Sequence, residues 1–271
     1  MAYCEVEKGV RLYYEDFGSG KPFLFIHGGG MSHEMWEQQV YDLADDFRVV
    51  SLDLRGHGES DKPPHGHTFD RLVQDVEALV GYLGLSGINV VCHGIGGYVG
   101  ILLALKRPEL LARLVLVSTG ARFVGGDAQR GGFSTELWDS YTRGMASNKI
   151  AATTALVERT FFHVDPGPAT RQAVINIMLQ WPVYAMKMLG RDLEKVDLES
   201  RLGNLSVPTL VLHGVHDMKQ RYSGAAHLCS KIPGARMTPF ENSAHNPQLE
   251  EVAKFNRALR DFVSADSNAS F

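Results

Sequence analysis

The stretch Ile88-Asn-Val-Val-Cys-His-Gly-Ile-Gly-Gly97 decides the fold of this chain. Its first five residues form a short, mostly apolar run, which is typical of a β-strand buried on both faces of a sheet. A glycine-rich turn follows, and helical periodicity continues from there to Lys106. A buried strand that turns directly into a helix is the repeating unit of a parallel sheet wrapped by helices.

The same alternation of strand and helix signals continues on both sides of this unit. Short apolar runs predict further strands, and apolar residues at every third or fourth position predict helices. The predicted strands are residues 9–17, 23–26, 48–53, 113–117, 209–212 and 236–240, and the predicted helices are residues 69–83, 97–106 and 248–263. We therefore predict an α/β fold with a mostly parallel sheet.

The alternation stops between residues 121 and 199. This segment shows only helical patterns, around 134–162 and 169–190, and it is rich in aromatic and methionine side chains. These side chains either form a small helical core of their own or line an apolar pocket from the inner face of a lid. For the second case we expect contacts with the substrate from Trp138, Trp181 and Met186.

The composition excludes several classes of partner. The 271 residues are 44% hydrophobic and carry a formal net charge of −4, without the basic cluster that a nucleic-acid partner requires. Neither a membrane-spanning apolar run nor a signal-peptide pattern is visible. The three cysteines lack paired spacing and predict free thiols in a reducing compartment. We expect a cytoplasmic monomer or homodimer with a small-molecule substrate or ligand.

The glycine-rich turn after residues 88–92 has two possible uses. A dinucleotide loop that begins at Gly94 would need glycine where the chain has Val99, and no acidic residue ends the next strand. The alternative is a nucleophile elbow, in which small residues flank a nucleophile two positions away on each side. Here Cys92 and Gly96 are the small residues, and Gly94 occupies the middle without a side chain.

With this turn, the chain resembles the α/β-hydrolase superfamily, most of all its small-ester, enol-lactone and carbon–carbon-bond hydrolases and its haloperoxidase-like esterases. The matching segments, in order, are Phe25-Ile-His-Gly-Gly-Gly30, Asp53-Leu-Arg-Gly-His-Gly-Glu-Ser60, the elbow, residues 97–108, Pro208-Thr-Leu-Val-Leu-His-Gly214 and Asn242-Ser-Ala-His245. The resemblance implies a sheet of about eight strands, with a core of residues 1–120 and 200–271 and a helical lid inserted at 121–199. It implies neither an organic cofactor nor a metal.

The resemblance also assigns roles to single residues. Gly94 stands where the family has its nucleophilic serine, Asp217 is the acid, and His245 is the base. In such a triad the base removes the hydroxyl proton and the acid orients and stabilises the imidazole. The backbone N–H groups of Gly29 and Ile95 are expected to form the oxyanion hole, which binds the negative oxygen of the intermediate.

Other polar residues near these motifs are expected to have lesser roles. His27 is expected to form structural hydrogen bonds, Cys92 to lie in the strand, and Ser118 to lie near the rim without an elbow. The cluster His213-x-x-His216-Asp217 lacks further ligands for a metal. Four basic residues of the insertion are candidates to bind a carboxylate of the substrate: Arg122, Arg143, Arg159 and Arg191.

The missing hydroxyl at position 94 leaves three interpretations open. In the first, which we adopt, Gly94 replaces the serine of a hydrolase for a small, largely apolar ester or lactone, or for the carbon–carbon bond of a diketone. The replacement then gives an inactive form that holds an uncleaved ligand. In the second, His245 acts as a general base in a cofactor-free, lyase-like or oxygenase-like reaction. In the third, the protein is a small-molecule binding or sensor protein without turnover.

Overall fold

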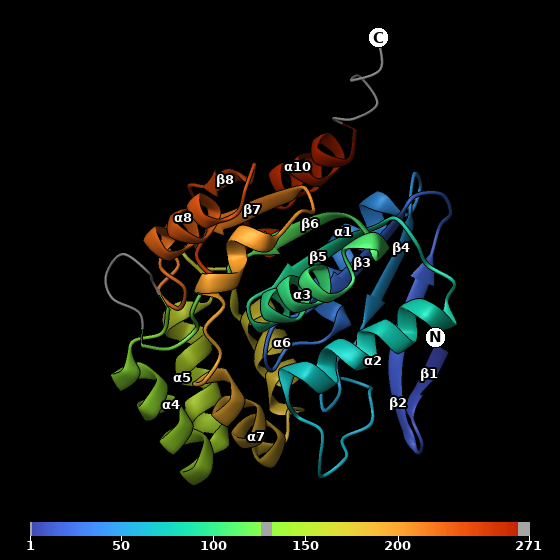
Figure 1. Ribbon diagram of the computed structural model, residues 1–271. Helices are drawn as coiled ribbons and strands as arrows, with labels where there is room; N and C mark the ends of the chain where they lie inside the picture. Colours follow the sequence, from blue (N-terminus) through green and yellow to red (C-terminus); the bar gives the residue numbers. More distant parts are fainter. Residues whose placement is uncertain (1, 126–131, 265–271) are drawn as a thin grey trace.

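The computed structural model describes residues 2–125 and 132–264, and it is built around one eight-stranded sheet (Figure 1). The strands are β1 (Ala2–Glu7), β2 (Val10–Phe17), β3 (Pro22–Ile26), β4 (Arg48–Leu52), β5 (Ile88–His93), β6 (Leu111–Val117), β7 (Thr209–Gly214) and β8 (Arg236–Phe240). Their order is β1-β2-β4-β3-β5-β6-β7-β8, and only the β1–β2 and β2–β4 pairs are antiparallel. The predicted mostly parallel α/β fold is confirmed.

Helices cover both faces of the sheet, which explains why its central strands are continuous apolar runs. Alternate residues of β3 enter two separate apolar clusters: Leu24 and Ile26 join one, and Phe23 and Phe25 join the other. The first cluster includes residues of α2 (Phe69–Tyr82) and α3 (Ile95–Lys106), and the second includes residues of α1 (Glu37–Leu43) and α10 (Val252–Ser264). The remaining elements outside the insertion are η1 (His33–Trp36), η2 (Pro108–Leu110), η3 (Glu199–Asn204), α8 (Tyr222–Lys231) and α9 (Pro247–Glu250).

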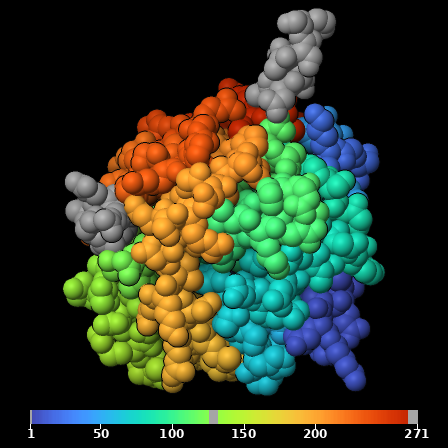
Figure 2. All heavy atoms as spheres, viewed as in Figure 1, coloured from blue at the N-terminus to red at the C-terminus, as the bar shows by residue number. Residues whose placement is uncertain are grey.

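Four helices lie between β6 and β7 in the sequence and gather at one end of the molecule (Figure 1). They are α4 (Thr135–Ser147), α5 (Lys149–Thr160), α6 (Pro168–Leu179) and α7 (Val183–Leu193). Each predicted helical segment is therefore a pair of helices. Asn148 directly precedes α5 and caps it, because its side chain accepts a hydrogen bond from the Ala151 backbone N–H, and Pro182 directly precedes α7. After α7 the chain returns to β7, and this returning segment is coloured orange on the face of the molecule that Figure 2 shows.

The sequence analysis missed some elements and misplaced others. Neither α1 nor α8 was predicted, and the single helix expected over residues 248–263 is divided into α9 and α10 at Glu251. Helix α3 begins at Ile95, two residues before the predicted start. Residues 126–131 of the predicted lid, and the two ends of the predicted core ranges, lie outside the described residues. Within the described part, no helix is long and apolar enough to cross a membrane.

A buried ion pair ties α2 to the loop after β4. The Arg55 guanidinium donates two hydrogen bonds to the Asp75 carboxylate, at 2.7 and 2.9 Å, and both side chains are fully buried. Arg71 also donates to Asp75, at 2.6 Å, and Arg55 also donates to Glu7, at 2.7 Å, so removing the Asp75 charge leaves two guanidinium groups with the single carboxylate of Glu7. We expect Asp75→Asn to lower the free energy of unfolding by about 3 kcal/mol in urea denaturation. The control Asp70→Asn, exposed on the same helix, should change it by less than about 1 kcal/mol. A similar effect of both substitutions would contradict this account.

Candidate active site

The turn between β5 and α3 has the backbone of a nucleophile elbow. Gly94 has φ +52° and ψ −118°, a left-handed conformation that favours glycine. Its backbone N–H donates to the Val117 carbonyl at 2.9 Å, and its carbonyl accepts from the Gly97 N–H at 3.0 Å. A Cβ atom at Gly96 would lie 2.5 Å from the His27 carbonyl oxygen. Close packing around the turn therefore requires a small residue at position 96.

Position 94 itself has room for a side chain. A Cβ atom there would find the His245 Nε2 atom at 3.6 Å and the Gly28 Cα atom at 3.7 Å, both ordinary van der Waals distances. The next atom of a serine, its Oγ, can then come within hydrogen-bonding distance of His245 Nε2. The turn thus places the missing side chain directly beside the predicted base.

His245 and Asp217 come from the loops after β8 and β7 and meet as predicted. The His245 Nδ1 atom lies 2.7 Å from the Asp217 Oδ2 atom, and both residues are buried. The other carboxylate oxygen accepts backbone hydrogen bonds from Lys219 and Gln220, at 2.8 and 3.0 Å. Because both carboxylate oxygens accept, Nδ1 carries the imidazole proton, and Nε2 has a free lone pair facing position 94.

Burial sets the electrostatics of this pair. It lowers the pKa of His245 well below its usual value, with smaller contributions from the Lys219 ammonium and from His213, so the imidazole is neutral at neutral pH. Burial raises the pKa of Asp217, whereas His213 and the backbone N–H groups of Gln220 and Lys219 lower it. A neutral imidazole held by a hydrogen-bonded carboxylate can act as a general base.

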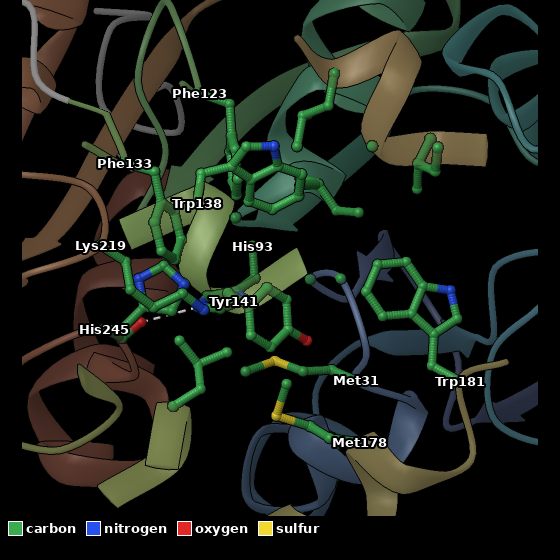
Figure 3. Close-up of a pocket in the computed structure, with 18 residues that line it drawn as sticks. Met31, His93, Phe123, Phe133, Trp138, Tyr141, Met178, Trp181, Lys219 and His245 are labelled. Carbon is green, nitrogen blue, oxygen red and sulfur yellow. Dashed lines mark hydrogen bonds between the residues drawn. The ribbon is translucent and has the colours of Figure 1, made fainter. Parts of the chain in front are cut away.

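An apolar pocket opens over position 94, between the sheet edge and the inserted helices (Figure 3). Its lining residues are Gly28, Gly29, Met31, His93, Gly94, Ile95, Phe123, Phe133, Trp138, Tyr141, Leu156, Met178, Trp181, Leu189, Gly190, Leu193, Lys219 and His245. This lining contains no serine, threonine or cysteine. Ser118 and Cys92 lie outside it, and Cys92 is buried where α3 crosses the strand at Gly100. Neither of these residues replaces the missing nucleophile.

The residues expected to contact the substrate are only partly in this pocket. Trp138 and Trp181 line it, whereas Met186 is not among its lining residues. Met186 lines a separate groove on the insertion, which the Trp138 side chain also borders, and Met178 of α6 lines the pocket instead. The four candidate arginines are also absent from the lining, where the cation is Lys219. The sequence analysis did not single out Lys219, Tyr141, Phe123 or Phe133.

The residues expected around the oxyanion hole lie close together. Gly29 and Ile95 both line the pocket, and a Cβ atom at Gly29 would come within 2.8 Å of the Ile95 side chain. Ile95 is the first residue of α3, where a backbone N–H has no partner within the helix. His27 is structural as expected: its Nδ1 donates to the Gly28 carbonyl at 2.7 Å, and its Nε2 accepts from the Leu54 N–H at 2.9 Å.

The histidines near Asp217 do not form a metal site. His213 Nε2 donates to the Gln220 carbonyl at 2.6 Å, and the exposed His216 stacks against His163. Among residues 2–125 and 132–264 there is no group of three or more His, Cys, Asp and Glu side chains that could hold a metal ion.

Comparison with known proteins agrees with this architecture. The family model described as the alpha/beta hydrolase fold matches residues 21–143. The chain is 31% identical to the AB hydrolase superfamily protein YisY of Bacillus subtilis over 97% of its own length and 99% of that protein. It is 26% identical to a non-heme haloperoxidase of Rhodococcus erythropolis, covering 98% and 100% of the two chains. The solved enol-lactonase of Burkholderia xenovorans LB400 superposes with a TM-score of 0.86 at 25% identity, covering 97% of this chain and 100% of that one. The chain belongs to the α/β-hydrolase superfamily.

Proposed function

We propose that this protein binds a small, mainly apolar ester or lactone in the pocket over Gly94, and that Gly94 stands in place of a nucleophilic serine. One observation carries the proposal: a Cβ atom at position 94 fits without a clash and lies 3.6 Å from His245 Nε2. The acid, the base and the pocket are thus complete around a position that lacks only its side chain. The enol-lactonase among the similar structures supports the class of substrate.

The chemistry of the parent reaction follows from this geometry. With serine at position 94, His245 would remove the hydroxyl proton while the oxygen attacks the ester carbonyl. The N–H groups of Gly29 and Ile95 would hold the negative oxygen of the intermediate, and Asp217 would stabilise the protonated imidazole. His245 would then protonate the leaving alcohol. Water, with His245 again as the base, would hydrolyse the acyl ester on the serine and release the carboxylic acid product. With Gly94 the first bond cannot form, so the ligand stays intact.

The inserted helices are proposed to act as a lid over this site. Each of the four helices α4, α5, α6 and α7 contributes at least one residue to the pocket lining: Trp138, Leu156, Met178 and Leu189, respectively. The core elements contribute the reacting side of the same pocket. We therefore propose a core of residues 1–120 and 200–271, which carries the reacting groups, and a lid of residues 121–199, which covers them.

A second function is supported by the His245–Asp217 pair alone. The neutral imidazole has a lone pair on Nε2 that faces the pocket, and a general base in this position needs no covalent nucleophile. It could remove a proton from a bound substrate, as a cofactor-free lyase-like or oxygenase-like enzyme requires. Conversion of a ligand without hydrolysis would distinguish this function from the first one, and binding without any conversion would indicate a sensor or carrier.

We expect the chain with Gly94 to hydrolyse esters at no more than a residual rate. An oxyanion hole and a base without their nucleophile retain catalysis of only about 10³–10⁴-fold over water. The test uses a panel of nitrophenyl esters and simple lactones, with calorimetric titration of the same esters to detect binding. Turnover above about 1 s⁻¹, an ordinary enzyme value, would show that position 94 is not the nucleophile position. The expected result is measurable binding with a turnover far below that value.

A further inference from the structure

Lys219 lies in the same pocket as the triad residues but has no role in the proposed reaction. It lies two residues after Asp217 on the loop that follows β7, and its side chain lines the pocket with only 6% of its surface exposed (Figure 3). Its Nζ atom lies 4.2 Å from the centre of the Phe161 ring and 5.9 Å from that of Phe133. The ammonium group is therefore held among aromatic rings at the wall of the site.

This ammonium group has no anionic partner in the described part of the chain. No carboxylate there lies within ion-pairing distance of Nζ, and no acceptor hydrogen-bonds it. Asp217 is close in sequence, but its two oxygens are already engaged by His245 and by backbone N–H groups. Buried lysines are rare unless they are paired, because an ammonium loses its hydration on burial. The aromatic rings compensate for only part of this loss.

The charge on Lys219 persists at neutral pH. Burial lowers the pKa of Lys219 to about 8, and the negative charge of Asp217 opposes this decrease. The other titratable side chains of the pocket lining are His93, Tyr141 and His245. Burial lowers the pKa of both histidines well below the usual value, so neither carries a positive charge at neutral pH. Lys219 is thus the one cation of this lining.

We propose that Lys219 binds a carboxylate of the ligand, so that the natural ligand combines an ester or lactone group with a free carboxylate. A single positive charge in an apolar pocket is balanced by a single negative charge, whereas a phosphate dianion would leave a second charge buried without a partner. The ester part of this inference rests on the proposed function, but the carboxylate site does not depend on position 94. Lys219 takes the role that the sequence analysis assigned to the arginines of the insertion.

The experiment uses the chain with Gly94, which does not consume its ligand, and two matched pairs of probes. Hexanoate and hexanamide differ only in charge, and monomethyl adipate and dimethyl adipate differ in charge while sharing the ester. At pH 7 we expect the charged member of each pair to bind about 10–100-fold more tightly, as one hydrogen-bonded ion pair in a desolvated site provides. Calorimetric titration measures the four dissociation constants.

Substitution of Lys219 should remove this preference and little else. Lys219→Met keeps the length and the apolar stem of the side chain, as well as the backbone N–H that donates to Asp217. We expect it to bring the two dissociation constants of each pair together while leaving the neutral probes within about threefold. Lys149→Met is the matched control, because Lys149 is a partly buried lysine of the insertion that donates to the Leu179 carbonyl outside the pocket. It should leave the preference unchanged.

A pH series provides an independent readout. Because the pKa of Lys219 is lowered to about 8, the preference for carboxylates should be constant between pH 6 and 7.5 and should weaken above pH 8 as the ammonium loses its proton. The other titratable groups facing it are Asp217, His93, His245 and Tyr141. Burial lowers the pKa of the two histidines and raises that of Tyr141, so none of these three changes charge near pH 8.

The possible outcomes separate this inference from the proposed function. Equal binding of charged and neutral probes, or a preference that persists in Lys219→Met, would overturn the carboxylate site. A preference for hexanoate that depends on Lys219, without binding of either adipate ester, would support the carboxylate site and contradict the ester ligand. If none of the four probes binds, the carboxylate site is overturned as well, because hexanoate tests it without an ester.

Discussion

Gly94→Ser is expected to convert this chain into a serine hydrolase and to raise ester turnover by about 10⁶-fold, the factor by which loss of the nucleophile alone lowers turnover in a serine hydrolase. The reason is local. The new Cβ atom would lie 3.6 Å from His245 Nε2 without a clash, and His245 is already neutral and held by Asp217. The new oxygen would therefore find its base in place. Because φ is +52° at this position, the side chain should cost about 1–3 kcal/mol of stability.

Gly94→Ala is the matched control for this substitution. Alanine introduces the same Cβ atom and the same backbone strain, but no oxygen, so it should match the serine variant in stability and the glycine chain in activity. Turnover of nitrophenyl esters gives the rate. A fluorophosphonate, which reacts covalently with activated serines, should label only the serine variant, and peptide mass spectrometry should locate the label at residue 94.

The result can also contradict the hydrolase proposal. If the serine variant is as stable as Gly94→Ala but shows neither labelling nor turnover, the elbow does not present a nucleophile. The behaviour of the glycine chain then decides between the remaining functions. Tight binding of an unchanged ester would favour a binding or sensor protein, and conversion of the ligand without hydrolysis would favour His245 acting as a general base.

The sheet could be predicted from the sequence because its strands are buried on both faces. A strand such as β3 is apolar at every position, and that signal does not depend on what packs against it. Helix α8 gives no comparable signal, because its buried residues are Gly224, Ala225 and Leu228, two of which are small. Helix α1 buries only Gln39 and Leu43. Short helices with so few buried apolar side chains show no clear periodicity.

The acid and the base were assigned through the resemblance to the α/β-hydrolase superfamily, and the topology of the sheet explains why they meet. Asp217 and His245 lie in loops directly after strands of a parallel sheet, and such loops meet at one edge. Lys219 follows the same strand, but a single lysine in a loop indicates nothing about its direction. Its side chain is held in the pocket by Phe161 and Phe133, which come from a distant part of the chain. Tertiary packing, which no local pattern encodes, decides its role.

The same limit applies to Met186, which is expected from the sequence to contact the substrate but is not among the residues that line the pocket. Both Met178 and Met186 belong to helices of the insertion, and their sequence neighbourhoods are similarly apolar. Of the two, Met178 lines the pocket and Met186 does not, because the way the helices pack against one another determines which methionine points into the pocket. At Gly190 of α7, for example, a Cβ atom would lie 3.1 Å from the Trp138 ring, so this glycine allows the indole to lie close to the helix. The indole then borders both the pocket and the groove that holds Met186.

Asp217→Asn in the Gly94→Ser background is expected to lower turnover by about 10⁴-fold, the loss seen when the acid of a triad becomes an amide. The hydrogen bonds around Asp217 determine how this happens. Its Oδ1 atom accepts from the Lys219 and Gln220 N–H groups, so the amide oxygen of asparagine must stay there and the amide nitrogen must replace Oδ2. That nitrogen is a donor facing His245 Nδ1, which then has to accept.

The imidazole proton is thereby moved to Nε2, where it blocks the lone pair that serves as the base. Ester turnover and the rate of fluorophosphonate labelling should fall together, while binding of an intact ester should remain within about threefold, since the pocket lining is unchanged. Glu199→Gln is the matched control, because Glu199 forms a comparable 2.6 Å contact with His227 outside the pocket. It should leave both rates unchanged. A loss smaller than about tenfold in the Asp217→Asn variant would mean that another group orients His245, since a triad acid contributes far more than that.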